Sequence, residues 1–151
     1  MTKTGFQNIF PVPIYTAFLD NKLADEIEDL VVPRLSNLEQ VPSQKTDYFL
    51  KDKIVSSKNE SHSSHAHGNA LISGVYYIRA NNNAGSLKFT NPNPLFINTD
   101  LKEGPKNEVN FEIKPQKGLL VLFPGWLLHE VLGSSIDNCT RTCLAFNLLK
   151  Q

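Results

Sequence analysis

Residues 118–131 read GLLVLFPGWLLHEV, and this stretch indicates the fold. Leu119 to Phe123 is apolar on both faces, which is typical of a short strand at the centre of a sheet. Pro124–Gly125 then turns the chain, and His129 follows on the next segment. The stretch therefore predicts a buried β-strand that leads through a tight turn to a histidine.

Short strands separated by turn residues continue on both sides of this stretch. Val109, Phe111 and Ile113 alternate with polar neighbours, which predicts a strand with one solvent-exposed face. Many short strands between turns are the pattern of an all-β sandwich or barrel. The predicted strands are 71–78, 86–89, 109–113, 118–123 and 141–148.

Glycine and proline mark the connections between these strands. NNNAG (81–85) and KPQKG (114–118) are expected to be turns in which glycine supplies a positive φ. Residues 91–99, with two prolines, are expected to form a loop over a mouth of the barrel. Ser73–Gly74 is interpreted as a small pair inside a strand, where glycine lets another group approach closely.

The N-terminal part differs from the rest of the chain. The prolines of FPVPIY (10–15) remove ladder donors and predict an extended edge segment. A helix follows, with Asp20 or Asn21 as its cap, and Pro33 is expected to end or kink it. One face of this helix should carry Leu23, Ile27, Leu30 and Val31.

The composition is that of one soluble globular domain: 151 residues, of which 40% are hydrophobic and 20% charged. Fifteen Lys and Arg balance fifteen Asp and Glu, which speaks against a nucleic-acid groove. No apolar run approaches the ~20 residues of a membrane span, and the first ten residues lack the apolar core of a signal peptide. We therefore expect a single cytoplasmic domain over residues 1–151, helical in about 1–40 and with a β core over about 65–150.

Histidines are the first candidates for chemistry, and the run HSSHAH holds three of the four. In a strand, residues i and i+2 point to the same face, so His65 and His67 can converge on one ion. Imidazole suits iron, zinc, copper and nickel, and a strand pair with one distant histidine is a common way to build a three-ligand site. Alternatively, the pair is solvated like His62, and His129 is a hydrogen-bonded histidine beside Trp126 at the edge of the core.

Arg141 and two cysteines complete the candidates. Arg141 opens the apolar run RTCLAFNLL, and a permanent charge there needs a partner. That partner is either an internal carboxylate or the carboxylate of a ligand, gripped bidentately. Cys139 and Cys143 have no second pair of sulfur ligands nearby, so we expect reduced thiols that pack.

Four motifs, taken in order, resemble the 2-oxoglutarate/Fe(II) oxygenase superfamily, and within it a small branch of bacteria and tailed phages. The motifs are HAHGNALISGVYYI (65–78), AGSLKFTNP (84–92), KGLLVLFPGWLLHEV (117–131) and RTCLAFN (141–147). The resemblance implies a mainly β fold, the double-stranded β-helix. This is a cupin-like jelly roll whose mouth holds the metal, here with the N-terminal helix packed on it.

The resemblance also implies a ligand set. The superfamily binds Fe(II) with two histidines and one carboxylate, leaving positions for 2-oxoglutarate and oxygen. His65 takes the first histidine place and His129 the distal one, while Arg141 matches the basic residue that binds the far carboxylate of 2-oxoglutarate. His67 stands where the carboxylate is usual, which leaves the site one unit more positive. Either His67 is the third ligand, or another carboxylate completes the site, or only two protein ligands exist.

These inferences favour an Fe(II)- and 2-oxoglutarate-dependent dioxygenase, most simply a hydroxylase. Its partners would be the small-molecule cosubstrate and a primary substrate that the sequence does not distinguish among peptide, sugar and nucleotide. One alternative is a cupin-like metal-binding protein without 2-oxoglutarate chemistry. Another is a non-catalytic jelly-roll module of a phage particle, and a phage-encoded protein would work in the host cytoplasm. The sequence does not indicate an oligomeric state.

Overall fold

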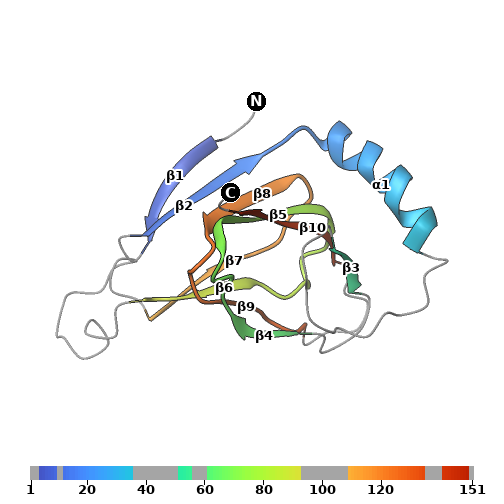
Figure 1. Ribbon diagram of the computed structural model, residues 1–151. Coiled ribbons are helices and arrows are strands. Elements are labelled where there is room, and N and C mark those ends of the chain that lie inside the picture. Colours follow the sequence, from blue (N-terminus) through green and yellow to red (C-terminus); the bar gives the residue numbers. More distant parts are fainter. Residues whose placement is uncertain are drawn as a thin grey trace.

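The computed structural model describes residues 4–9, 12–35, 51–55, 61–92, 109–134 and 141–149. In these residues the chain forms β-strands and one helix, α1 (Asn21–Leu35) (Figure 1). The strands are β1 (Thr4–Ile9), β2 (Val12–Phe18), β3 (Lys51–Val55), β4 (His62–His65), β5 (Ala70–Ala80), β6 (Leu87–Thr90), β7 (Asn110–Ile113), β8 (Leu119–Pro124), β9 (His129–Val131) and β10 (Arg141–Leu149).

Two antiparallel sheets form the body of the molecule. The larger sheet has the strand order β1-β2-β8-β5-β10-β3, and the smaller has the order β4-β9-β6-β7. From β3 to β10 the chain passes repeatedly between the two sheets, which lie one above the other (Figure 1). This is the double-stranded β-helix expected from the sequence. The strand order makes β4 and β9 neighbours although they are far apart along the chain.

The core fills the space between the sheets. Side chains alternate across β5, so Val75 and Tyr77 pack into this core while Tyr76 and Ile78 face the opposite side. On the core side they meet a cluster from both sheets: Val12, Ile14, Leu87, Phe89, Ile113, Leu119, Val121, Phe123 and Leu127. The larger sheet is therefore apolar on both faces at its centre, which explains why residues 119–123 have no polar alternation.

Helix α1 covers the outer face of the larger sheet (Figure 1). Asp20 caps it, its carboxylate accepting from the backbone N–H of Lys22 at 3.0 Å. Ala24 and Ile27 pack against the sheet, whereas Leu30 is 62% exposed. The predicted apolar face of the helix was therefore only partly right. Ile27 packs on the sheet as predicted, but its neighbour in that contact is the small Ala24 and not Leu23 or Leu30. Leu23 is 40% exposed, and the side chain of Val31 lies outside the described residues.

Several connections depart from the sequence predictions. The helix continues past Pro33 to Leu35. The five predicted strands are present within one or two residues at their ends, but β4 and β9 were not predicted.

Gly74 in β5 allows the side chain of Phe146 to approach the backbone closely, because a Cβ at Gly74 would overlap the Phe146 ring. Cys143 is a thiol that packs against the core, as predicted. Cys139 and most of the predicted loop 91–99 lie outside the described residues. Within the part of the chain that the structure describes, no helix is long and apolar enough to cross a membrane.

The two predicted turns use glycine for different reasons. Gly118 has φ of 80°, as the sequence predicts for a turn glycine. Gly85 does not have a positive φ, so that prediction was wrong. Its lack of a side chain is needed for another reason, since a Cβ would overlap the carbonyl oxygen of Leu132. Gly85 thus allows the β5–β6 turn to pack directly on the segment that follows β9.

Replacing Gly85 by Ala should destabilise the protein by about 3 kcal/mol, because the new methyl group meets backbone atoms that cannot rotate away. In a protein of this size that corresponds to a melting temperature lower by roughly 10 °C. Gly68→Ala is the matched control, since a Cβ at Gly68 meets no atom within 4 Å. Thermal unfolding of both variants measures the difference, and equal melting temperatures would contradict the packing described above.

Candidate metal centre

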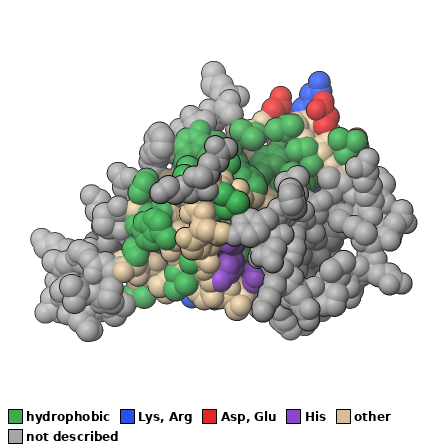
Figure 2. Space-filling view, viewed as in Figure 1, with side chains coloured by type: hydrophobic (Ala, Val, Ile, Leu, Met, Phe, Trp, Pro, Cys, Tyr) green, Lys and Arg blue, Asp and Glu red, His purple; other side chains and the backbone are tan. Residues whose placement is uncertain are grey.

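Three of the predicted site residues come together at one end of the β-sandwich. His65 ends β4, His67 follows it, and His129 begins β9. One possible ligand atom from each of these side chains lies within 4.8 Å of the others. Histidine side chains reach the surface on the face seen in Figure 2. The structure therefore gathers a cluster of three imidazoles that is open to solvent.

Strand pairing sets the positions of two of these histidines. His65 and His129 are directly opposed in the β4–β9 ladder, and their ring centroids lie 4.3 Å apart. Nδ1 of His65 lies 2.8 Å from the carbonyl oxygen of Ser63, and Nδ1 of His129 lies 2.8 Å from that of Leu127. A carbonyl only accepts, so both Nδ1 atoms carry a hydrogen and donate it. Nε2 of each ring keeps its lone pair, which is the form that binds a metal ion.

His67 reaches the cluster in a different way from the one predicted. It is not in a strand with His65, because β4 ends at His65. Its backbone N–H instead donates to the carbonyl oxygen of Gly125 at 2.7 Å, in the turn after β8. The side chains of His65 and His67 still lie close, with ring centroids 5.0 Å apart. His62, expected in a loop, is the first residue of β4 and stacks on His65 at 4.3 Å.

The surroundings favour the neutral form of two of the three rings, His67 and His129. Burial lowers the pKa of His129 to about 4, with smaller contributions from the other histidines, and the bond to Leu127 opposes the shift. Burial first, and then the charge of His65, also lowers the pKa of His67. The rings of His67 and His129 are therefore neutral at pH 7, as ligation requires.

The stability of the metal-free protein should fall as the pH drops from about 6.5 to about 4. In this window the unfolded chain takes up a proton on His129, whose ordinary pKa is 6.5, while the folded protein does not. The difference between the pKa of His129 in the unfolded chain and in the folded protein corresponds to on the order of 3 kcal/mol in the free energy of unfolding. The lowered pKa of His67 changes the stability in the same direction. Urea unfolding at pH 7 and pH 4.5 measures the loss. His129→Gln should reduce the pH dependence, and an unchanged dependence would contradict the assignment.

Aromatic side chains back the cluster on its inner side. The ring of Phe123 packs against His129 with centroids 4.7 Å apart, and Phe89 packs against Phe123 at 4.9 Å. Both phenylalanines are buried in the core. Phe89 and Phe123 lie in the quoted motifs, but the sequence alone did not predict a part in the site for either ring. They close the inner side of the histidine cluster to water.

Arg141, the fourth predicted site residue, contacts the turn between β5 and β6. It begins β10 and is buried, and its Nη1 donates to the carbonyl oxygen of Gly85 at 2.9 Å. Among the described residues no carboxylate pairs with it. Tyr77 lies close enough to interact with its charge, and burial raises the pKa of that phenol while Arg141 opposes the rise. The phenol of Tyr77 therefore stays protonated beside a buried cation.

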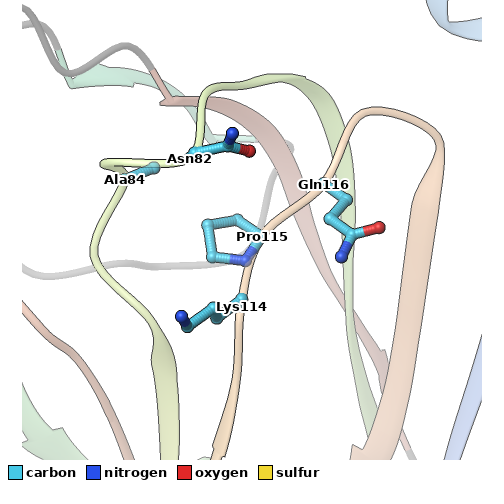
Figure 3. Close-up of a pocket in the computed structure, with 5 residues that line it drawn as sticks. All are labelled: Asn82, Ala84, Lys114, Pro115 and Gln116. Carbon is cyan, nitrogen blue, oxygen red and sulfur yellow. The ribbon is translucent and has the colours of Figure 1, made fainter.

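A pocket of about 310 Å³ opens near the opposite end of the sandwich from the histidines. Figure 3 shows its lining, which comes from the turn after β5 and the turn after β7. None of the four predicted site residues lines it. The lining residues are Asn82, Ala84, Lys114, Pro115 and Gln116. The pocket is therefore separate from the candidate metal centre.

Comparison with known protein families agrees with this geometry. A family model described as "Putative 2OG-Fe(II) oxygenase" matches residues 53–147, which include the three histidines and Arg141. The chain belongs to the 2OG-Fe(II) oxygenase family. The sequence resemblance is thereby confirmed at the level of the family, and Fe(II) and 2-oxoglutarate are the cofactors of this family.

One of the similar solved structures, a prolyl-4-hydroxylase, has the same fold as this chain. A prolyl-4-hydroxylase from Pseudomonas putida is 15% identical with a TM-score of 0.65, covering 91% of this chain and 88% of that one. A 2OG-Fe(II) oxygenase family oxidoreductase from Burkholderia pseudomallei is 11% identical with a TM-score of 0.45, covering 99% and 76%. An N-substituted L-amino acid dioxygenase from Burkholderia ambifaria, in complex with alpha-KG, is 13% identical with a TM-score of 0.42, covering 85% and 68%. The comparison with curated proteins finds no match.

Proposed function

We propose that this 2OG-Fe(II) oxygenase is a hydroxylase that binds Fe(II) through His65, His67 and His129 and 2-oxoglutarate through Arg141. The observation that carries the proposal is the cluster itself, with three imidazole ligand atoms within 4.8 Å of one another. A set of neutral nitrogen donors suits a divalent transition metal.

The residues present fit both groups. Two of the imidazoles are held with Nε2 free by backbone carbonyls, an arrangement common to metal-binding histidines. Arg141 has a buried guanidinium that uses one nitrogen on Gly85 and meets no described carboxylate, so it can grip a dicarboxylate. When bound, Fe(II) and 2-oxoglutarate would supply the oxidising chemistry with dioxygen as the oxidant: one oxygen atom would enter the substrate as a hydroxyl group, and the other would enter succinate as 2-oxoglutarate loses carbon dioxide.

The distance between the two binding elements is compatible with a short cosubstrate. Gly85, which accepts from Arg141, packs on Leu132, and Leu132 is three residues beyond His129. Three residues of extended chain span about 10 Å. Phe89 and Phe123 lie on the core side and keep water from that part of the barrel. The chain thus contributes ligands, a cation and an apolar wall, and it holds them in fixed positions.

Anaerobic titration of 2-oxoglutarate into the Fe(II)-loaded protein tests the proposal. We expect a visible absorption band from charge transfer between iron and the chelating keto acid, saturating at one equivalent. The iron-free protein with 2-oxoglutarate is the control and should show no band. Iron binding without the band would instead favour the cupin-like alternative, and no metal binding would favour a non-catalytic jelly-roll module such as a phage particle component.

His67 is expected to be a true ligand in the place where a carboxylate is usual. His67→Asp supplies an anionic oxygen donor and should preserve or strengthen Fe(II) affinity. His67→Leu has no donor and should weaken it by at least about tenfold, because second-shell changes alone cost 10–100-fold. Calorimetric titration of both variants with Fe(II) measures the change. Equal affinities for wild type and His67→Leu would leave a site with two protein ligands.

A further inference from the structure

A polar pair lies inside the barrel at the same level as the histidine cluster. Ser73 on β5 is directly opposite Phe123 on β8 and opposite Asn147 on β10. Phe123 is the ring that packs against His129. Directly opposed residues share one face of a sheet, so Phe123, Ser73 and Asn147 form a row across the inner face of the larger sheet. Neighbouring strands are about 4.8 Å apart, which places Asn147 roughly 10 Å from Phe123.

The pair has one fixed and one open member. Ser73 is 2% exposed and its hydroxyl donates to Oδ1 of Asn147 at 2.6 Å. Asn147 itself is exposed. The bond fixes the orientation of the amide and uses its oxygen, so both hydrogens of Nδ2 remain for another acceptor, and no described residue takes them. A buried serine thus holds an exposed amide as a hydrogen-bond donor.

The segments that flank this pair on the side of the histidines carry no acidic or basic residue, whereas β3, on the other side of β10, places Lys51 opposite Ala145. Residues 61–73, 122–129 and 145–149 contain no Asp, Glu, Lys or Arg. Leu71, at the start of β5, is 59% exposed and lies where the register of β5 against β10 shifts. A group that approaches the histidines along this wall therefore meets the amide donor of Asn147.

We propose that Asn147, held by Ser73, donates a hydrogen bond to an uncharged carbonyl group of the primary substrate and orients that substrate beside the metal. The substrate class is an amide-containing compound whose carbonyl oxygen accepts from Nδ2 of Asn147. This inference rests on the proposed function, because it needs a metal at the three histidines. Asn147 is a positioning residue, and Ser73 acts through it.

The test uses Mn(II) in place of iron, 2-oxoglutarate, and N-acetyl-L-leucinamide as a neutral amide probe. Bound Mn(II) shortens the relaxation times of probe protons that come near it, so proton NMR measures binding next to the histidines. We expect saturable relaxation of the probe methyl groups with wild type. Asn147→Leu keeps the volume but has no donor, and it should weaken probe binding about three- to tenfold. Ser73→Ala frees the amide and should give a smaller loss, and Asn82→Ala, in the distant pocket, is the matched control and should give none.

Two further measurements keep the outcomes distinct. Asn147→Leu alone leaves the buried hydroxyl of Ser73 without its partner, whereas the double variant Ser73→Ala with Asn147→Leu does not. The inference is supported if both Asn147→Leu and the double variant lose probe binding while their melting temperatures stay near that of wild type. Equal probe binding by wild type and both variants, or no binding to Mn(II)-loaded wild type, overturns it. The electron spin resonance signal of free Mn(II) reports metal binding separately. A protein that leaves Mn(II) free overturns the proposed function instead.

Discussion

His129→Ala is expected to abolish stoichiometric binding of Fe(II). His129 supplies one of three ligand atoms, and its ring is held by the bond to Leu127 and by packing against Phe123. Loss of a residue that only orients a ligand lowers metal affinity 10–100-fold, so loss of the ligand itself should exceed about hundredfold. Anaerobic calorimetric titration with Fe(II) measures the affinity, and circular dichroism reports whether the fold is retained.

His62→Ala is the matched control for this prediction. His62 lies on β4 and stacks on His65, but it is exposed and is not one of the three clustered ligands. Its removal should leave one Fe(II) per chain with an affinity within about tenfold of wild type, because a stacked ring pair contributes only about 0.5–1.5 kcal/mol. Equal iron binding by His129→Ala and His62→Ala would show that the cluster is not the metal site.

Arg141→Lys should weaken the binding of 2-oxoglutarate about ten- to hundredfold while leaving Fe(II) binding unchanged. The planar guanidinium can bond to Gly85 and still present further N–H donors to a carboxylate, and a lysine ammonium does not reproduce that geometry. Hydrogen bonds to charged groups contribute roughly 1.5–3 kcal/mol, which corresponds to this range of affinities.

Titration of the absorption band with 2-oxoglutarate gives the dissociation constant for wild type and variant. Arg79→Lys provides the control, since Arg79 lies on β5 but pairs with Glu28 of α1 on the outer face of the sheet. Its effect on 2-oxoglutarate affinity should be negligible. An unchanged affinity in Arg141→Lys would show that Arg141 does not bind the cosubstrate. Its charge would then be paired with a protein carboxylate such as Asp137, which lies outside the described residues.

Much of the fold was predictable because the core strands have strong local signals. Residues 119–123 are apolar on both faces, and the structure places them between the core and a face packed on α1. Strands β4 and β9 were missed because HSSH is polar and HEV is only three residues long. Their strand structure depends on pairing with each other, which joins segments about sixty residues apart, and no local pattern encodes it.

The three histidines that cluster in the structure were all candidates from the sequence, but their geometry was less predictable. The spacing of His65 and His67 suggested a strand, yet the backbone of His67 follows the turn at Gly125 instead. The convergence on His129 came from the family resemblance. The Ser73–Asn147 pair needed the register of β5 against β10, because seventy-four residues separate its members. Single-sequence patterns do not report such cross-strand positions.

Anomalous X-ray scattering from a crystal soaked with Fe(II) or Mn(II) under anaerobic conditions tests the central claim most directly. We predict one strong peak per chain, about 2.0–2.2 Å from a ring nitrogen of each of His65, His67 and His129, the range typical of metal–nitrogen and metal–oxygen bonds in proteins. Nε2 should be the bonded atom of His65 and His129, because their Nδ1 atoms donate to backbone carbonyls. A fully soaked crystal with no peak between these three side chains, or with its peak elsewhere, would contradict the account.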